Sequence, residues 1–261
     1  IEKVVFIGDN APDGTLHFAS ELAASEAEPM IEASADECAF WLYSSGSTGR
    51  PKGVRHVHGS LKATADTYGT QVLGIREDDV VYSAAKFFFA YGLGNAMTFP
   101  MSVGATTVIL AGRPTPDSVL DIFERHRPSI FCGVPTLYAA LVAAMKGTKP
   151  AGFDRLRHSI SAGEALPEEV GKRWEAITGT PILDGVGSTE MLHIFLSNRR
   201  GDVVYGTSGT AVPGYELRLV DENNQDVAAG GVGELLVKGP SAADGYWNQR
   251  DKSRSTFEGN W

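Results

Sequence analysis

Short apolar runs alternate with helix-like segments through the middle of the chain. The runs that favour strands lie at residues 80–85, 105–110, 129–132, 158–161 and 181–184. Between them, helix-like segments occupy residues 93–103, 117–126, 135–145 and 166–177. Short strands that alternate with helices of about ten residues indicate βαβ units, which form a mostly parallel sheet with flanking helices. We therefore predict an α/β fold.

The first part of the chain carries weaker signals. The elements expected there are a short strand at residues 4–7, a short helix at 19–27, a buried strand at 38–43 and a helix at 60–72. Ser60 is a residue type that favours helix starts, so we expect it to be the N-cap of the last of these.

The pattern changes again after about Asn198, where glycines become frequent and helical spacing disappears. Apolar runs at residues 216–220 and 233–238 lie on either side of a turn-like segment at 221–224. This arrangement indicates a small antiparallel β section. The predicted organisation is an α/β subdomain over residues 1–198, followed by an antiparallel β subdomain over residues 199–261.

Composition narrows the class of protein. Of the 261 residues, 43% are hydrophobic and 21% are charged, as in ordinary globular proteins. The net charge of −9 and the absence of a Lys/Arg run argue against a nucleic-acid partner. No apolar run approaches the roughly 20 residues that a membrane helix needs, and no secretion signal is visible. We expect neither nucleic acid nor membrane among the partners, and a homodimer is left open.

The two cysteines, Cys38 and Cys132, each lie in an apolar strand-like run. We expect both to be buried free thiols, which persist in a reducing compartment, and we therefore expect a cytoplasmic protein. No Cys/His spacing in the sequence resembles a zinc site.

The segment YSSGSTGRPKG at residues 43–53 is rich in small and hydroxylic residues and carries Lys52. Glycines allow the backbone N–H groups to approach a ligand closely, hydroxyls add donors, and the lysine adds a point charge. This pattern favours a polyphosphate-binding loop over the alternative, a solvated turn. A Walker A loop is excluded because Lys52 is followed by Gly53 and preceded by Pro51.

A second candidate is the segment DGVGSTEM at residues 184–191, which follows a predicted strand. Ser188, Thr189 and Glu190 place hydroxyls beside a carboxylate, as a magnesium–phosphate complex requires. The alternative is an ordinary helix start with Ser188 as its cap and Glu190 in the first turn.

Two further segments offer surfaces for flat groups. SAGEA at residues 161–165 follows a strand, and its small residues suit an adenine or an aromatic ring, although an ordinary turn is equally compatible. KFFFAYGLG at residues 86–94 is aromatic. We interpret residues 87–89 as core and Tyr91 as the residue that faces a cavity. His193, as a lone histidine, is more often structural than catalytic.

Ligands of parallel sheets sit beyond the carboxyl ends of the strands. We expect the three small-residue loops at residues 44–53, 161–165 and 185–190 to lie at that edge.

Together these segments resemble the adenylate-forming superfamily, which comprises acyl- and aryl-CoA synthetases, luciferase and peptide-synthetase adenylation domains. YSSGSTGRPKGV resembles the family's phosphate loop, DGVGSTEM its magnesium and phosphate segment, and GELLVKGPS at residues 233–241 a further stretch. KFFFAYGLGNA, SAGEALP and STEMLHIFLSN are similar to benzoate–CoA and 4-hydroxybenzoate–CoA ligases in particular.

The resemblance implies roles for individual residues. Those implied to hold ATP phosphates are Ser44, Ser45, Gly46, Ser47, Thr48, Gly49, Lys52, Ser188 and Thr189. Those implied to enclose adenine are Gly163, Glu164, Ala165, Asp184, Gly185 and Val186. Those implied to line an aryl pocket are Ala90, Tyr91, Ala162, Gly187, His193 and Ile194. Glu190 is implied to bind Mg²⁺, and Lys52, Thr189 and Glu190 to take part in catalysis.

The implied reaction joins an aromatic carboxylate to ATP as an acyl-adenylate, from which coenzyme A displaces AMP, in the degradation of aromatic compounds. The resemblance also implies a ribose-binding segment, a hinge and a small C-terminal lid domain beyond Trp261. We therefore expect a central fragment that is inactive alone. Alternatives are a synthetase for another carboxylic acid, an adenylation domain that loads a carrier protein, and a non-catalytic nucleotide-binding module.

Overall fold

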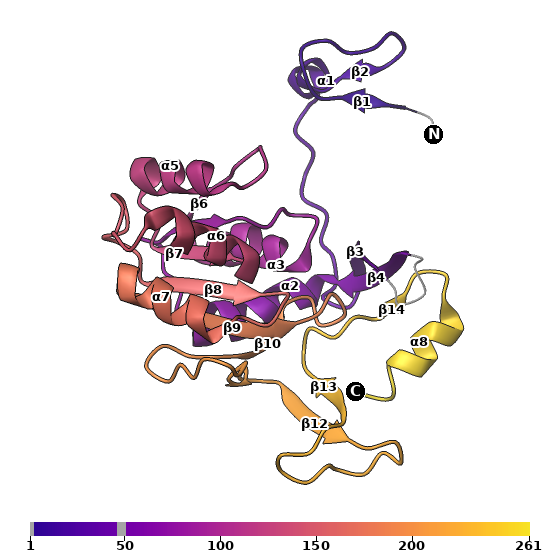
Figure 1. Cartoon of the computed structure of the whole chain (residues 1–261). Helices are drawn as coiled ribbons and strands as arrows, with labels where there is room; N and C mark the ends of the chain where they lie inside the picture. The colour runs from indigo at the N-terminus through magenta and orange to yellow at the C-terminus, as the bar shows by residue number, and fades with distance from the viewer. Residues whose placement is uncertain (1–2, 46–50) are drawn as a thin grey trace. The chain divides into compact units, whose positions relative to one another are not determined.

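The computed structural model describes residues 3–45 and 51–261. The chain divides into two compact units, Ile1–Ala33 and Ser34–Trp261. In the first unit, β1 (Val5–Phe6) pairs in parallel with β2 (Leu16–His17), and α1 (Phe18–Ala24) follows directly. The strand and the helix expected there are therefore present, and both are shorter than predicted (Figure 1).

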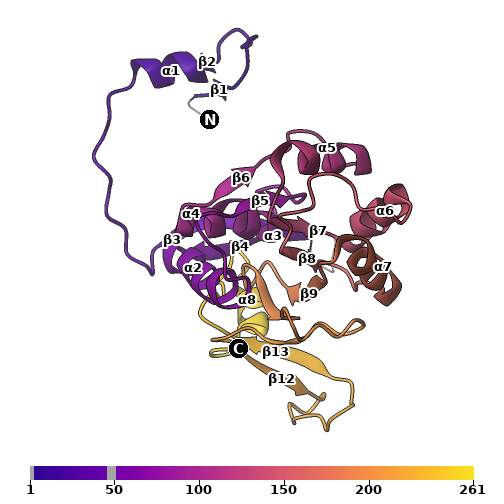
Figure 2. The same cartoon turned by 90° about the vertical axis from the view of Figure 1, so that its left-hand side faces the viewer.

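A seven-stranded sheet is the centre of the second unit, with the order β11-β10-β9-β8-β7-β5-β6 (Figures 1 and 2). Its strands are β5 (Val80–Ser83), β6 (Thr106–Val108), β7 (Ile130–Gly133), β8 (His158–Ala162), β9 (Ile182–Gly187), β10 (Ile194–Ser197) and β11 (Thr210–Ala211). The pairs from β6 to β9 are parallel, and β10 and β11 extend the sheet in antiparallel fashion. The predicted α/β class and mostly parallel sheet are confirmed.

Helices connect and cover these strands. They are α2 (His58–Thr64), η1 (Ala65–Val72), α3 (Ala90–Leu93), η2 (Gly94–Thr98), α4 (Phe99–Val103), α5 (Pro116–His126), α6 (Pro135–Met145), α7 (Glu168–Thr178) and α8 (Arg250–Thr256). The α5 helix starts with a capping box between Thr115 and Ser118 and has Pro116 in its first turn, as its sequence favours. The predicted cap at Ser60 is wrong, because α2 starts two residues earlier and Ser60 is buried inside it.

The two faces of the large sheet bury two separate hydrophobic clusters. Tyr82 and Phe131 pack with α5, α6 and α7 on one face, while their neighbours Val81 and Cys132 pack with η1 and α4 on the other. Successive side chains of a strand point to opposite faces, so continuous apolar runs suit a sheet that is covered on both sides. The edge of this sheet is therefore held by a well-packed scaffold.

A smaller antiparallel sheet has the order β14-β4-β3, formed by β14 (Gly245–Tyr246), β4 (Pro51–Val57) and β3 (Cys38–Ser45). The predicted strand at 38–43 exists, but the expectation that it is buried is wrong. Leu42 points inward, whereas Trp41 and Tyr43 are 43% and 65% exposed. Cys38 is also exposed, so only Cys132 is the buried thiol that we expected. A run of apolar residues cannot distinguish a strand covered on both faces from one covered on a single face.

Strand β4 also has one inward face. Lys52, Val54 and His56 alternate along it, with Val54 and His56 fully buried and Lys52 partly so. The opposite side carries Gly53 under the Tyr43 ring and Arg55 paired with Asp244. The inward face of β4 therefore presents one cation and one imidazole toward the rest of the unit.

Residues 199–261 contribute to several sheets. β12 (Glu216–Val220) and β13 (Glu234–Lys238) form an antiparallel ladder, and Asp221–Asn224 make a turn beside it, as expected. β11 joins the large sheet and β14 joins β4. The subdomain boundary near residue 198 stays a prediction.

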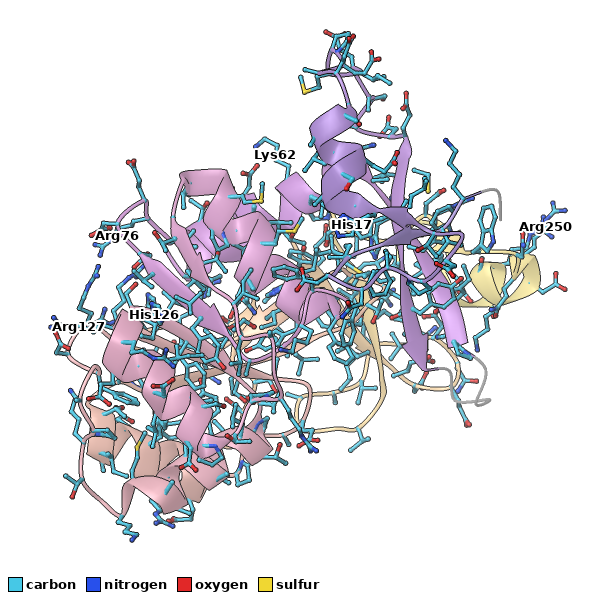
Figure 3. The ribbon with its side chains drawn as sticks, turned by 90° about the horizontal axis from the view of Figure 1, so that it is seen from above. His17, Lys62, Arg76, His126, Arg127 and Arg250 are labelled. Atoms are coloured by element: carbon cyan, nitrogen blue, oxygen red, sulfur yellow. The ribbon has the colours of Figure 1, made fainter. Side chains whose placement is uncertain are left out.

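The surface shows charges of both signs. Lys62 on α2, Arg127 after α5 and Arg250 on α8 lie on separate parts of it (Figure 3). Lys62 pairs with Asp66, and Arg127 pairs with Asp154. Among the helices that the structure describes, none is long and apolar enough to cross a membrane.

Candidate functional site

The β3–β4 hairpin brings Lys52 to Glu190, although 138 positions separate them in the sequence. Lys52 is opposite Ser44 in the hairpin, and its Nζ lies 3.2 Å from Oε1 of Glu190. The expectation that residues 44–53 form a loop on the large sheet is wrong for the described part of that segment, because Ser44 and Ser45 belong to β3 and residues 51–53 belong to β4 of the smaller sheet. Gly46, Ser47, Thr48 and Gly49 lie outside the described residues, so their phosphate contacts stay predictions. For Ser45, the structure describes only the backbone pairing with Pro51.

Tyr246 completes a triangle with these two side chains. Its hydroxyl donates to Oε1 of Glu190 over 2.8 Å and accepts from Nζ of Lys52 over 3.1 Å. Burial alone would raise the pKa of Glu190, but the Tyr246 bond and the Lys52 charge lower it below its usual value. Burial likewise opposes charge on Lys52, but Tyr246 and Glu190 raise its pKa. The two groups are thus an ionised pair at neutral pH.

The turn after β9 is tied to β4 by His56. Its Nε2 lies 2.8 Å from the carbonyl oxygen of Thr189, and it must carry the proton because a carbonyl only accepts. Burial lowers the pKa of His56, so the imidazole is neutral. The residues after β9 form a turn in which Ser188 Oγ accepts from Met191 N–H over 3.1 Å, and the alternative of a helix start there is wrong.

The two segments implied for adenine lie side by side. In the β8–β9 ladder, Ser161 is opposite Asp184, and Ala162 is opposite Gly185. Burial raises the pKa of Asp184 to about 6, and its Oδ1 has no hydrogen-bond partner in the described part of the chain. Gly163 follows with φ of +96°, and nothing lies within 4 Å of where a Cβ would be. This edge therefore offers a buried acceptor beside an open backbone segment.

The adjoining residues of both segments occupy different environments. Glu164 and Ala165 are exposed after Gly163, and Val186 is partly buried at the end of β9. Ser44 on β3 is partly buried, with an Oγ that lacks a partner among the described residues.

The residues implied for the aryl pocket form an aromatic wall. The rings of Tyr91 and His193 stack with centroids 5.8 Å apart, and Tyr68 and Phe99 also contact His193. Burial lowers the pKa of His193 to about 3, so this imidazole is neutral. Gly94 packs directly against the His193 ring, so that an added Cβ would lie only 2.4 Å from Cδ2 of His193.

Backbone pairing fixes the rest of that wall. Ile194 is opposite Gly187 at the start of β10, and Tyr91 donates to the carbonyls of Gly133 and Ile160 over 3.1 and 3.0 Å. Ala90, the first residue of α3, is partly exposed. The structure therefore brings Tyr91 on α3 together with Gly187, His193 and Ile194, which lie about a hundred positions later in the sequence.

A cleft of about 1160 Å³ opens at the carboxyl ends of β5, β7 and β8, with Tyr91, Ala162 and Gly163 in its lining. Phe88 and Phe89 also line it and are 65% and 55% exposed, so the core interpretation of residues 87–89 is wrong. Their backbone forms a surface loop that turns the rings outward.

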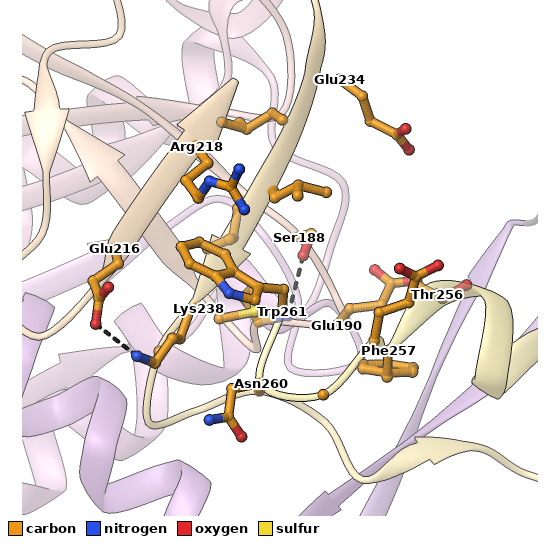
Figure 4. Close-up of a pocket in the computed structure, with 18 of the residues that line it drawn as sticks. Ser188, Glu190, Glu216, Arg218, Glu234, Lys238, Thr256, Phe257, Asn260 and Trp261 are labelled. Carbon is orange, nitrogen blue, oxygen red and sulfur yellow. Dashed lines mark hydrogen bonds and ion pairs between the residues drawn. The ribbon is translucent and has the colours of Figure 1, made fainter. Parts of the chain in front are cut away.

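A second cavity, of about 1360 Å³, lies beside the turn that carries Glu190. Figure 4 shows Ser188 near the middle of its lining, with Glu216, Arg218 and Lys238 on one side and Glu190, Thr256 and Phe257 on the other. Trp261 stacks near Arg218 and Lys238, with the cations 5.7 and 5.9 Å from its ring. Glu190 therefore borders an open space on the side away from the large sheet.

Sequence reasoning missed Tyr246 and His56. Tyr246 lies in a short apolar stretch near the chain end, and His56 lies within a strand beside another histidine. Neither position carries a pattern that indicates chemistry, since both contacts arise only when β4 meets β14 and the turn after β9.

Comparison with known proteins now gives the family. Residues 2–247 match the AMP-binding enzyme family. The chain is 60% identical to a benzoate–CoA ligase of Thauera aromatica over 87% of its length, which is 43% of that relative. It is 53% identical to a 4-hydroxybenzoate–CoA/benzoate–CoA ligase of Rhodopseudomonas palustris over its whole length, which is 48% of that relative.

Solved structures of CoA ligases also resemble this chain closely. A benzoate CoA ligase from Burkholderia xenovorans superposes with a TM-score of 0.90 at 50% identity, over 99% of this chain and 51% of that one. An anthranilate CoA ligase in complex with anthranoyl-AMP gives a TM-score of 0.95 at 39% identity, over 100% of this chain and 51% of that one. The chain thus spans about half the length of these relatives. On this evidence the chain belongs to the AMP-binding enzyme family.

Proposed function

We propose that this chain supplies the nucleotide- and aryl-acid-binding part of an ATP-dependent aryl-CoA ligase. The acid is benzoate or 4-hydroxybenzoate, and the reaction passes through an acyl-adenylate before the thioester with coenzyme A forms. The observation that carries the proposal is the meeting of Lys52 with Glu190, which pairs a phosphate-seeking cation with a metal-seeking carboxylate. The two relatives at 53–60% identity are ligases of these acids and support the choice of substrate.

The residues at the site fit ATP with Mg²⁺. Mg²⁺ usually takes one or two carboxylates and completes its shell with water and substrate phosphates. Glu190 is such a carboxylate, and the described residues contain no group of three or more acidic, His or Cys ligands that would form a protein cage. When bound, the ion would neutralise phosphate charge. The open backbone at Gly163 and the unpaired Oδ1 of Asp184 suit the edge of an adenine.

Lys52 does the main electrostatic work in this proposal. An aromatic carboxylate attacks the α-phosphate poorly because both partners are negative. The Lys52 ammonium and the N–H groups near Ser44 stabilise the charge that builds on the phosphate oxygens. Thr189 adds a hydroxyl beside the same phosphates. The attack breaks the bond between the α-phosphorus and the oxygen that bridges to the β-phosphate, so pyrophosphate leaves and a mixed anhydride of the acid with AMP forms. The thiol of coenzyme A then loses its proton and displaces AMP to give the thioester.

The aromatic wall selects the acid. Tyr91 and Ala162 line the cleft at the carboxyl ends of β5, β7 and β8. The buried, neutral His193 stacks behind Tyr91, and Ile194 packs in the core cluster beside them. A flat slot suits a single ring better than a flexible alkyl chain. Benzoate or 4-hydroxybenzoate should therefore exceed octanoate by at least about tenfold in kcat/KM.

The first test measures pyrophosphate release by a full-length protein that includes this chain, with a panel of carboxylic acids, because we expect the chain alone to be inactive. Lys52→Ala and Glu190→Gln should each slow release by about ten- to a thousandfold, the range for a lost electrostatic group. Lys62→Ala and Glu168→Gln are matched controls, because these side chains are more than half exposed and pair only with a helix neighbour. Release at the unaltered rate in both site variants would refute the proposal. Faster turnover of octanoate would refute the aryl substrate.

A further inference from the structure

Tyr246 contacts both charged residues of the proposed phosphate and metal site. Its hydroxyl is the donor to Glu190 over 2.8 Å and the acceptor from Lys52 over 3.1 Å. The Lys52 ammonium also lies 4.5 Å from the centre of the Tyr246 ring. A tyrosine that only filled space would not need its hydroxyl to face this pair.

The two contacts to Glu190 share one oxygen. Both the Lys52 ammonium and the Tyr246 hydroxyl bind Oε1, and neither binds Oε2. A carboxylate whose one oxygen is held by hydrogen bonds presents the other in a fixed direction. Ligating carboxylates in metal sites are oriented in this way by neighbouring donors.

The Tyr246 side chain is itself well anchored. It is 6% exposed and packs with Val54, Ala243 and Phe257. Its backbone N–H donates to Ser253 Oγ on α8 over 2.8 Å, and its strand pairs with β4, which carries Lys52. The hydroxyl is therefore held by the pairing of β14 with β4 and by a hydrophobic cluster, in which the Ala243 N–H also donates to the Glu190 carbonyl over 2.8 Å.

The Lys52 and Tyr246 hydrogen bonds to Glu190 should respond differently when a nucleotide binds. If a nucleotide phosphate binds, Lys52 is drawn to it, because the phosphate carries more negative charge than one carboxylate. The Tyr246 hydroxyl is neutral and can remain on Oε1 beside a cation. It is the contact that would keep Glu190 in place after Lys52 has turned away.

We propose that Tyr246 is a positioning residue that holds Oε1 of Glu190 so that Oε2 faces the divalent cation of a bound magnesium–nucleotide. This inference rests on the proposed function, since it assumes that Glu190 serves a nucleotide-bound cation. It adds a residue from the chain end to the site and assigns it one effect, on the metal-dependent part of nucleotide binding.

The test compares ATP binding with Mg²⁺ and with a chelator, measured by isothermal titration calorimetry on the unaltered protein and on Tyr246→Phe. The phenylalanine keeps the ring and removes only the hydroxyl. We expect the gain in ATP affinity that Mg²⁺ provides to fall by about ten- to a hundredfold, the usual cost of losing a residue that orients a metal ligand. Binding of metal-free ATP should change by less than about twofold.

Tyr215→Phe is the matched control. Tyr215 is also 6% exposed, and its hydroxyl bonds over 2.6 Å to Ser241, whose Oγ donates to the Met191 carbonyl over 2.6 Å. The control therefore disturbs the turn beside Glu190 without removing a bond to Glu190 itself. This variant should keep the full Mg²⁺ gain. In a Glu190→Gln background, Tyr246→Phe should cause no further loss of that gain, because the residue on which it acts is already altered.

The outcomes separate the two ideas. If Mg²⁺ strengthens ATP binding equally in the unaltered protein and in Tyr246→Phe, the positioning role is wrong and the proposed function stands. If Tyr246→Phe loses metal-free binding to the same extent, or if Tyr215→Phe behaves alike, Tyr246 is merely structural. If the unaltered protein binds no ATP, or gains nothing from Mg²⁺, the proposed function fails first and this inference fails with it.

Discussion

The large sheet and the β3–β4–β14 sheet are built in different ways, and the proposed site lies where they meet. The large sheet is covered on both faces, and residues such as Trp174 and Phe131 are fully buried against it. The small sheet has one open face, where Trp41, Tyr43 and Trp247 are 43%, 65% and 45% exposed. Lys52 comes from the small sheet, and Glu190 follows a strand of the large one.

This contrast suggests a division of roles. The large sheet supplies most of the hydrophobic burial and holds the aromatic wall. The small sheet and the residues next to it reach the turn after β9 through a few polar contacts. These are Lys52 and Tyr246 with the Glu190 carboxylate, His56 with the Thr189 carbonyl, and Ala243 N–H with the Glu190 carbonyl. We expect changes in the large sheet to act mainly on stability, and changes at the contact to act mainly on binding and rate.

The largest expected effect is a difference in stability between variants of two tryptophans, one packed against each sheet. Trp174→Ala removes a fully buried ring that also donates to Ser159 Oγ over 2.9 Å, and it should lower the free energy of unfolding by about 3–5 kcal/mol. Trp247→Ala on the open face should cost about 1 kcal/mol or less, since surface changes are mild. Urea unfolding followed by circular dichroism measures both. Equal losses would mean that the small sheet is as stabilising as the large one.

An intermediate effect should appear in the pH dependence of stability. Burial raises the pKa of Asp184 from its usual value near 4 to about 6. Between these two values the carboxyl is ionised in the unfolded chain but protonated in the fold, so stability falls as pH rises from about 4 to about 6 and then levels off. The free energy of unfolding of Asp184→Asn should therefore rise relative to that of the unaltered protein by about 2 kcal/mol between pH 4 and pH 8. The pKa of Glu190 is lowered instead, so its charged form stabilises the fold at neutral pH. Glu190→Gln should therefore be less stable than the unaltered protein at neutral pH. This difference should shrink as pH falls below the usual glutamate range, where the unaltered protein loses the same stabilisation.

Two unfolding series across pH 3–8 provide the measurement. The two carboxylates are six positions apart and should show opposite slopes. A parallel pH profile for both variants would contradict the environments described for them.

The smallest effect on stability concerns the contact between the sheets. His56→Phe keeps the stacking on Phe40 and removes the donor to Thr189, whose carbonyl still accepts from Leu192 N–H over 3.1 Å. We expect a loss of about 1 kcal/mol. Pyrophosphate release by the full-length protein that includes this chain should nevertheless slow by about tenfold, because the turn that carries Glu190 loses its tie to β4. His58→Phe, at an exposed neighbouring position, should change neither quantity. If His56→Phe lost much stability while pyrophosphate release stayed normal, the proposed division of roles between the two sheets would be wrong.

Most of the large sheet could be predicted from the sequence because alternating apolar strands and helices allow few other arrangements. The strand at residues 129–132 and the helix at 135–145 lie within one or two residues of the observed β7 and α6. These elements depend on local spacing, and local spacing is what a sequence displays.

The errors arise where burial is decided by distant partners. Trp41 and Phe88 belong to apolar runs that look like core, yet one lies on the open face of a hairpin and the other lines a cleft. Ser60 has the chemistry of a cap, but α2 starts earlier. Lys52 and Glu190 were expected in one site, whereas Tyr246 could not be found because its role depends on β14 pairing with β4.

The alternation along β4 constrains how this protein can change in evolution. Lys52 and His56 share a face only because an odd number of residues separates them. Inserting or deleting one residue between them would send one side chain to solvent, even if every residue type were kept. Substitutions at exposed positions of the same hairpin leave the number of residues between Lys52 and His56 unchanged. We therefore expect descendants of this chain to vary in the residues of β4 more readily than in its length.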